Sequence, residues 1–364
     1  MTPLLRDRRA FLGTAAMTLA AAEFGGLGLA MGAGPSRQLR AIGDAATWLN
    51  SPPLSAASLL HKPVLVQFGT YTCINWLRTL PYVRAWQRLV PALTVIAVHT
   101  PEFAFEHDLD NVRRALQHLD VALPLVLDND YAIWRAFDNH YWPALYLLDG
   151  RGRVRHRHFG EGGYQESERA IRRLIADSAG AAGASHATGP NARSGDDPIA
   201  PIAATGFEVQ ADWPSLRSPE IYLGHDRGEG LASPGGASLS KRRAYTVPAR
   251  LDLNRWALDG EWTIERQPVS LGSASGRIVC RFHARDVHLV VGPARRGERV
   301  RFRVSLDGQP PGAARGVDVD EHGAGTIGDQ RLHQLIRQPG PIVDRTFDIA
   351  FLDAGAEAFA FTFG

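Results

Sequence analysis

The pattern of hydrophobic and polar positions divides the chain into two regions. Between about residues 60 and 178, short apolar runs alternate with stretches in which apolar residues have helical spacing. The predicted strands are 64–68, 93–98, 123–127, 144–148 and 154–159, and the predicted helices are 74–89, 111–119, 130–137 and 166–175. Strands that alternate with helices form a sheet that helices cover on both faces. We therefore expect an α/β fold with a mixed sheet and flanking helices.

From about residue 205 to the end, the pattern changes to strands without a convincing long helix. The predicted strands are 277–284, 287–291, 299–306, 346–352 and 358–363, whereas 332–336 fits either a strand or a single turn. Turn residues separate these segments at regular intervals, which is typical of an all-β sandwich or jelly roll. Residues 179–204 are aperiodic and rich in small residues, Gly and Pro, so we predict a flexible linker there.

The N-terminus has the features of an export segment. Arg8 and Arg9 are followed by Phe11-Leu12 and an uncharged run over 13–22, a pattern that resembles a twin-arginine signal; an amphipathic helix is the alternative. Glu23 interrupts the run, and a membrane span needs about 20 apolar residues, so we expect no stable span after signal removal. The predicted organisation is therefore a signal over 1–34, an α/β domain over 40–178, the linker, and a β domain over 205–364, in a periplasmic or extracellular protein.

Composition narrows the function classes. The 40 basic and 38 acidic residues give a net charge of +2, which excludes a strongly basic nucleic-acid-binding protein. Cys73 and Cys280 are the only cysteines, which excludes a disulfide-dense scaffold and a four-cysteine zinc site. No cofactor is expected from these features.

Cys73 is the residue best placed for chemistry. It follows the strand that ends at Phe68 and precedes the helix that starts near Ile74. Backbone N–H groups and the positive end of a helix favour a thiolate over a thiol, and the thiolate is the nucleophile. The Tyr141-Trp142-Pro143 segment directly precedes another strand, and a proline there can adopt a cis bond and place a backbone edge beside the thiol.

Several segments resemble the extracytoplasmic thioredoxin-like region of DipZ-type and TlpA-like thiol-disulfide proteins. They are KPVLVQFGTYTCINWLRTLPYVRAW, VHTPEF, NHYWPALYLLD and HFGEGGY. The segments ARDVHLVVGP, GVDVDEHGAG, RLHQLIRQPG and DRTFDIAFLD resemble the carbohydrate-binding-module-like domain that accompanies this region in some members. The resemblance covers roughly 45–364 and implies a thioredoxin fold and a thiol-exchange ancestry. DipZ-type proteins also carry a membrane electron-transfer domain, which this sequence lacks.

Three positions depart from the family pattern. Trp76 stands where the Cys-x-x-Cys motif has its second cysteine, Gln67 where a buried Asp serves proton transfer, and Gly69 where a Trp is common. A dithiol enzyme needs the second thiol to release its mixed disulfide, so an ordinary thioredoxin cycle within this chain is excluded. A monothiol reaction of Cys73 with envelope thiol or disulfide proteins is compatible with the sequence, with Pro143 shaping the peptide-facing edge.

Two alternatives to monothiol exchange remain open. Thr70 and Thr72 precede Cys73, and Thr70-Tyr71-Thr72-Cys73 fits the Thr-x-x-Cys pattern of peroxiredoxins, with Arg78 or Arg84 as the arginine that would position a peroxide. In the other alternative the thioredoxin-like domain is redox-inactive and both domains bind, one to a polypeptide and the other to a glycan or envelope polymer.

The remaining candidates are weaker. The aromatic residues that could stack on a sugar are Trp213, Tyr222, Trp256 and Trp262, although core packing is commoner in a small sandwich. Asp318, Asp320 and Glu321 offer oxygens to a calcium ion, and His156 and His158 share a strand face without an evident third ligand. A Cys73–Cys280 disulfide is a minor possibility, because Cys280 fits a small buried hydrophobe better.

Overall fold

The computed structural model describes residues 34–181 and 202–364, and Pro35–Gly364 form one compact unit. The predicted export signal and most of the predicted linker lie outside the described residues. Among the described residues, no helix is long and apolar enough to cross a bilayer. The helix that precedes the linker continues to Ala181, three residues beyond its predicted domain boundary.

The first part of the chain forms a six-stranded mixed sheet, which confirms the predicted α/β thioredoxin-like fold class. Its strands lie in the order β1-β4-β3-β2-β5-β6. Strands β2, β3 and β4 are parallel to one another, and the other neighbours are antiparallel. The bounds are β1 Trp48–Leu49, β2 Val64–Gly69, β3 Thr94–His99, β4 Leu125–Leu127, β5 Ala144–Leu148 and β6 Val154–Phe159.

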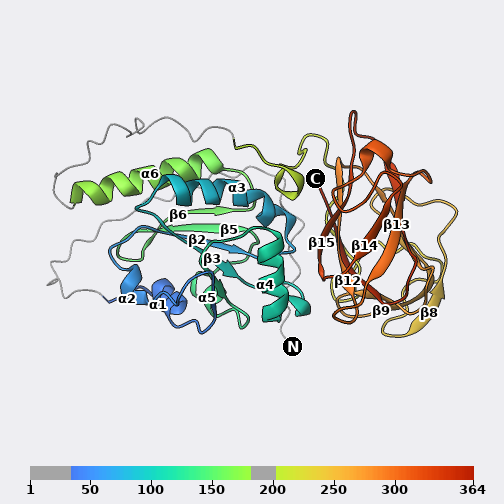
Figure 1. Ribbon diagram of the computed structural model, residues 1–364, viewed down its shortest axis with the longest axis horizontal. Coiled ribbons are helices and arrows are strands. Elements are labelled where there is room, and N and C mark those ends of the chain that lie inside the picture. The colour runs from blue at the N-terminus through green and yellow to red at the C-terminus, as the bar shows by residue number, and fades with distance from the viewer. Residues whose placement is uncertain (1–33, 182–201) are drawn as a thin grey trace. The chain divides into compact units, whose positions relative to one another are not determined.

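Helices cover both faces of this sheet (Figure 1). On one face, α1 Arg37–Gly43, α2 Ala56–Leu59 and α5 Ala132–Ala136 pack against alternate residues of β2, such as Val66 and Phe68. On the other face, α3 Ile74–Leu89, α4 Leu109–His118 and α6 Tyr164–Ala181 pack against Leu65 and its neighbours. A short 3-10 helix, η1 Ala104–His107, precedes α4. Helices α1 and α2 and strand β1 were not predicted, because they are too short to show a period.

The second part is an antiparallel β-sandwich, as the turn spacing predicted. Its strands are β7 Ile221–Tyr222, β8 Arg242–Tyr245, β9 Trp256–Ile264, β10 Val269–Leu271, β11 Arg277–Phe282, β12 Asp286–Pro293, β13 Val300–Leu306, β14 Ala324–Ile327, β15 Arg331–Arg337, β16 Arg345–Phe351 and β17 Ala356–Phe363. Two 3-10 helices accompany them: η2 Gly206–Glu208 precedes β7, and η3 Gly312–Ala314 lies between β13 and β14. The ambiguous segment 332–336 is a strand, because it pairs along β12.

Strand β9, which was not predicted, joins the two layers of the sandwich. Its first half pairs with β11 and its second half with β10. Gly260 lies between the halves with φ +93°, a conformation that costs glycine little. Trp256 and Trp262 lie on the same face of β9 and pack in the interior with Cys280.

Both faces of β12 are buried. Leu289 lies in the sandwich core, whereas Val290 belongs to the buried cluster that contains Leu77 of α3. This is why all eight positions of β12 are buried rather than every second one. The hydrophobic core of the thioredoxin-like part therefore continues onto the outer face of the sandwich.

Candidate active site around Cys73

Cys73 occupies the N-cap position of α3, as the sequence predicted. Its backbone amide donates to the carbonyl of Thr70 at 3.1 Å, and its carbonyl accepts from the amide of Leu77 at 3.1 Å. The sulfur accepts no capping hydrogen bond, but the nearby backbone amides of Trp76 and Asn75 act to lower the pKa of the thiol. The thiol therefore has the amide environment expected of a thioredoxin-type nucleophile.

Pro143 lies at the same edge of the sheet. Strand β5 runs antiparallel to β2 and pairs Ala144 with Phe68, so the residue before β5 lies beside the turn that leads from β2 to Cys73. The Trp142–Pro143 bond is cis. The Trp142 indole N–H donates to the carbonyl of Thr100 at 3.0 Å, and the Thr100 amide donates to Gly69 at 3.1 Å. These bonds tie the prolyl loop to the end of β2.

Trp76 and Gly69 are complementary in shape. The Trp76 side chain is 2% exposed, and a Cβ added at Gly69 would overlap its indole ring. The indole therefore needs a glycine at position 69. The two departures from the family pattern thus belong together. The indole of Trp76, on α3, packs against Gly69 at the end of β2, where the family commonly has a tryptophan.

The position of the family's buried Asp has no ionisable group. Gln67 is 1% exposed and its side-chain amide donates to the Thr79 hydroxyl, which in turn donates to the Trp76 carbonyl at 2.6 Å. An amide does not titrate. Proton transfer to or from Cys73 therefore cannot use this position.

A buried carboxyl group beneath the loop was not predicted. Glu106 accepts from the Thr72 hydroxyl at 2.6 Å and from the backbone amides of Glu102 and Phe103 at 2.6 and 2.9 Å. Burial raises the pKa of Glu106 to about 7, although the Thr70 and Thr72 side chains act to lower it. The VHTPEF segment ends at Phe103, three residues before Glu106. No pattern in this part of the sequence indicated that Glu106 would be buried.

Most of the residues proposed to bind a peroxide are engaged elsewhere. Thr72 bonds to Glu106, Arg78 pairs with buried Glu161 at 3.3 Å, and Arg84 pairs with Glu208. The peroxiredoxin-like interpretation needs a hydroxyl and a guanidinium beside the sulfur. Both guanidinium groups are paired with carboxylates, whereas the buried Thr70 hydroxyl, at the first position of the Thr-x-x-Cys pattern, makes no hydrogen bond to a described residue.

The surroundings of Cys73 raise the pKa of its thiol and outweigh the small contribution that the helix end was expected to make in favour of the thiolate. Burial is the main cause, followed by the charge of Glu102; Glu220 acts in the same direction. Glu102 accepts from the Tyr222 hydroxyl at 2.8 Å and from Arg227 at 2.6 Å. A helix end contributes about 1 kcal/mol or less, and burying a charge costs more. The thiol is therefore protonated in this conformation.

Both cysteines are free thiols, so the minor prediction of a Cys73–Cys280 disulfide is wrong. Cys280 is fully buried in the sandwich core, as expected of a small hydrophobe. Its pKa is raised by burial. It is therefore a packing residue.

The sugar-stacking prediction is wrong for two of its four residues. Trp256 and Trp262 are 1% and 0% exposed and lie in the sandwich core. Tyr222 is partly buried and contacts Glu102 and Arg227. Trp213 is 56% exposed, and nothing around it indicates a ligand. The aromatic pattern of β9 thus identified core residues rather than a sugar-binding surface.

The weak metal candidates are occupied by protein groups. Asp318 accepts from Arg331 at 2.6 Å and from the Gln334 amide at 2.8 Å, and Asp320 accepts from two backbone amides of its own turn. His156 contacts the Ser167 hydroxyl at 3.2 Å. The described residues contain no cluster of three or more His, Cys, Asp or Glu side chains that could hold a metal ion.

Comparison with known proteins supports the thioredoxin-like assignment. Residues 218–364 match the family described as "Thioredoxin like C-terminal domain". "Protein DipZ" of Mycobacterium tuberculosis is 36% identical over 250 residues, which are 67% of this chain and 34% of DipZ. "Thiol-disulfide oxidoreductase YkuV" of Bacillus subtilis is 29% identical over 131 residues, which are 36% of this chain and 88% of YkuV.

Among solved structures, "Solution Structure of a Thioredoxin-like Protein in the Oxidized Form" is 30% identical with a TM-score of 0.33, and it covers 36% of this chain and 88% of its own. The chain spans about a third of the length of the DipZ proteins it matches. The match to residues 218–364 does not describe a carbohydrate-binding module, so that resemblance stays a prediction. The chain is a homologue of DipZ within the thiol-disulfide oxidoreductase-like proteins of thioredoxin fold.

Proposed function

We propose that the protein is an exported monothiol thiol-disulfide oxidoreductase in which Cys73 is the only reacting thiol. The observation that carries the proposal is the position of Cys73 at the N-cap of α3, at the sheet edge that also holds Pro143. Homology to DipZ supports the reaction class. The twin-arginine-like N-terminus supports export, so the partners would be envelope proteins that carry thiols or disulfides.

The reaction conserves atoms and electrons without a cofactor. Cys73 loses its proton, and the thiolate attacks one sulfur of a partner disulfide. A Cys73–partner bond forms, the partner's own disulfide bond breaks, and its second sulfur leaves as a thiolate that takes up a proton. An external thiol, as its thiolate, then attacks the partner's sulfur in the mixed disulfide; a bond forms between the external sulfur and the partner, the Cys73–partner bond breaks, and Cys73 leaves and takes up a proton. Because Trp76 stands where a second thiol would resolve the adduct, the mixed disulfide should be long-lived.

Glutathione disulfide tests this proposal without a known partner. The reduced full chain is incubated with the disulfide, and the adduct is located by mass spectrometry of its peptides. We expect one glutathione on Cys73, none in the Cys73→Ser variant, and an unchanged adduct in the Cys280→Ser variant. The absence of any adduct on Cys73, at neutral or at alkaline pH, would overturn the proposal.

The raised pKa of the Cys73 thiol favours a second candidate function, which is docking without chemistry. In that case the edge around Pro143 would hold a polypeptide, and Cys73 would only pack. Capture of envelope proteins on the immobilised chain separates the two. Partners that elute only with a reductant, and are lost in Cys73→Ser, indicate exchange, whereas partners that Cys73→Ser retains equally indicate docking.

A further inference from the structure

The sandwich part contacts the loop beside Cys73 through a compact polar latch, which we define as Glu102, Tyr222 and Arg227. Tyr222 and Arg227 both donate to the same carboxylate oxygen of Glu102. The Arg227 guanidinium lies 3.4 Å from the centre of the Tyr222 ring. Glu102 is therefore held by two side chains that lie more than a hundred residues away in the sequence.

Apolar contacts continue from this latch. Phe359 of β17 packs against Phe103 and Phe105, with ring centres 5.3 and 4.7 Å apart. The buried cluster that contains Phe359 also contains Val290, and Cys73 packs against it. Cys73 is partly buried, and the sandwich residues of this cluster supply part of the packing around it.

The same face of the sandwich also buries polar groups without protein partners. His288 on β12 pairs in register with Gln334 on β15 and with Thr362 on β17, so the three side chains share one face with Val290. Neither ring nitrogen of His288, nor the side-chain amide of Gln334, nor the Thr362 hydroxyl has a hydrogen-bond partner among the described residues. Two nitrogens of Arg78, Nε and Nη2, on the facing helix α3, also have no hydrogen-bond partner among the described residues. Such groups destabilise a closed contact, because water would satisfy them if it opened.

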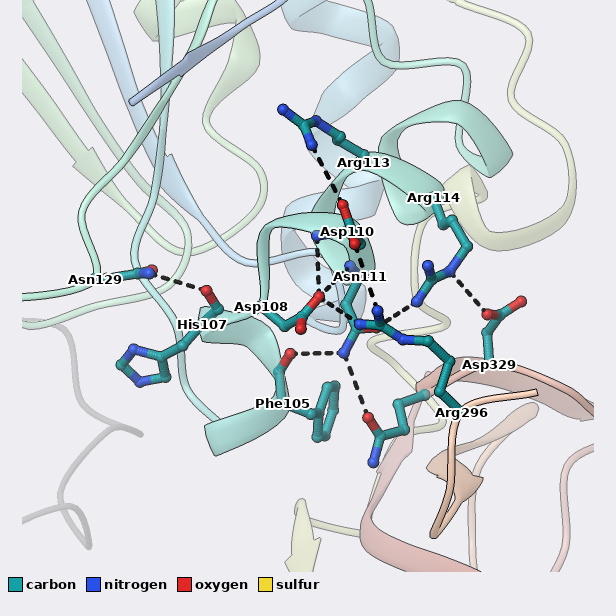
Figure 2. Close-up of polar contacts among 11 residues, drawn as sticks. Phe105, His107, Asp108, Asp110, Asn111, Arg113, Arg114, Asn129, Arg296 and Asp329 are labelled. Carbon is teal, nitrogen blue, oxygen red and sulfur yellow. Dashed lines mark hydrogen bonds and ion pairs between the residues drawn. The ribbon is translucent and has the colours of Figure 1, made fainter. Parts of the chain in front are cut away.

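The rim of the contact consists of largely exposed ion pairs. Figure 2 shows Arg296, from the loop after β12, reaching Asp108 and Asp110 at the start of α4, and Arg114 of α4 reaching Asp329. Exposed pairs stabilise weakly and are screened by salt. Apolar packing therefore stabilises the contact between the sandwich and the thioredoxin-like part, whereas the unpartnered polar groups reduce the stability of this contact.

We infer that the sandwich part is a removable cover over Cys73, and that the latch and the Phe359 contact open to admit a partner polypeptide to the thiol. The inference rests on the proposed function for the identity of the reacting group. Opening exposes Cys73 and hydrates His288, Gln334, Thr362 and Arg78 together. Opening separates Val290 and Phe359 from the buried cluster of the thioredoxin-like part, whereas the sandwich core around Cys280 contains neither residue and stays folded.

Alkylation of the reduced full chain by iodoacetamide tests the cover, with the extent at each cysteine followed by mass spectrometry. Cys280 is the internal reference, because it lies in the sandwich core and becomes accessible only when the sandwich unfolds. Arg296→Ala weakens the rim without changing the neighbours of the thiol, and we expect it to increase the Cys73 rate about two- to fivefold. Phe359→Ala removes an apolar contact, and we expect an increase of at least about tenfold.

Arg301→Ala is the matched control, because Arg301 pairs with Asp353 within the sandwich and is similarly exposed. It should leave the Cys73 rate unchanged, and no variant should increase the Cys280 rate. Equal Cys73 rates in the wild type, Arg296→Ala and Phe359→Ala would overturn the cover, as would parallel increases at both cysteines.

The glutathione adduct separates this inference from the proposed function. Variants that speed alkylation of Cys73 but never form an adduct would leave the cover standing and refute the exchange reaction. An adduct that forms at one rate in all variants would support exchange and refute the cover.

Discussion

Restoring a cysteine at position 76 tests whether Trp76 and Gly69 form one rearrangement. Trp76→Cys removes an almost fully buried indole from the contact with Gly69. Substitutions of this size cost about 3–5 kcal/mol in folding free energy. Gly69→Trp alone places a ring where the Trp76 indole already lies. Gly69 does not have a positive φ, so the cost of that substitution is steric and should be about 1–3 kcal/mol or more.

The double variant should be more stable than the two single costs imply. With Trp76→Cys in place, an indole at position 69 can enter the space that the first indole leaves. We expect the summed cost to fall by about 2 kcal/mol, within the range for residues in contact. Urea unfolding of the wild type, both single variants and the double variant under reducing conditions measures this coupling.

Trp86 provides the matched control for this cycle. It is another buried tryptophan of α3, and at about 1.5 Å of rise per residue it lies roughly 15 Å along the helix from Trp76. Gly69→Trp combined with Trp86→Cys should therefore be additive. Additivity within about 0.5 kcal/mol for the Gly69 and Trp76 pair as well would refute the complementarity. Reduction of insulin disulfides by dithiothreitol gives a second readout, because catalytic turnover should appear only in variants that carry Trp76→Cys.

Three further predictions follow from buried ionisable groups. The raised pKa of Cys73 predicts an alkylation rate that still increases above pH 9, the ordinary value, and a Cys73→Ser variant that loses less stability there than the wild type. Because the pKa of Glu106 is raised to about 7 in the folded state, its contribution to stability should be fully present below about pH 4.5 and lost as the pH rises to about 7. The loss should total a few kcal/mol, at about 1.4 kcal/mol per pH unit. Thermal unfolding of Glu106→Gln across this range should not show this pH dependence. Arg78→Met leaves the Glu161 carboxylate buried without its partner and should destabilise by about 3–5 kcal/mol in urea, whereas Arg78→Met with Glu161→Gln should recover much of that loss.

The regular part of the fold could be predicted because its signals are local. Strand 64–68 and helix 74–89 are long enough for periodicity to identify them, and the structure has them at nearly the same bounds. Strand β9 was missed although Trp256, Leu258, Trp262 and Ile264 alternate along it and all lie in the sandwich core, because Asp259, Gly260 and Glu261 interrupt the apolar pattern. Its aromatic residues then looked available for a ligand, although the alternation places them on the core face.

The candidate site divides in the same way. The positions of Cys73 and Pro143 follow from the order of strand, thiol, helix and prolyl loop, so the sequence predicted them. Glu106 could not be predicted as a buried acid, because its burial depends on how η1 folds back beneath the turn at Thr72. Its ordinary surroundings in the sequence, Phe105 and His107, carry no sign of the contact.

The protonation state of Cys73 shows why local sequence cannot set reactivity. Two amides within three residues of the sulfur favour the thiolate, and these were visible in the motif. Glu102 lies 29 positions away and Glu220 lies 147 positions away, and both oppose the thiolate together with burial. Arg227 offsets the charge of Glu102 only while the latch is closed, which is also when burial is greatest. Burial is the largest cause of the raised pKa, so we expect opening to make Cys73 more acidic and more reactive, even though it also removes Arg227 from Glu102.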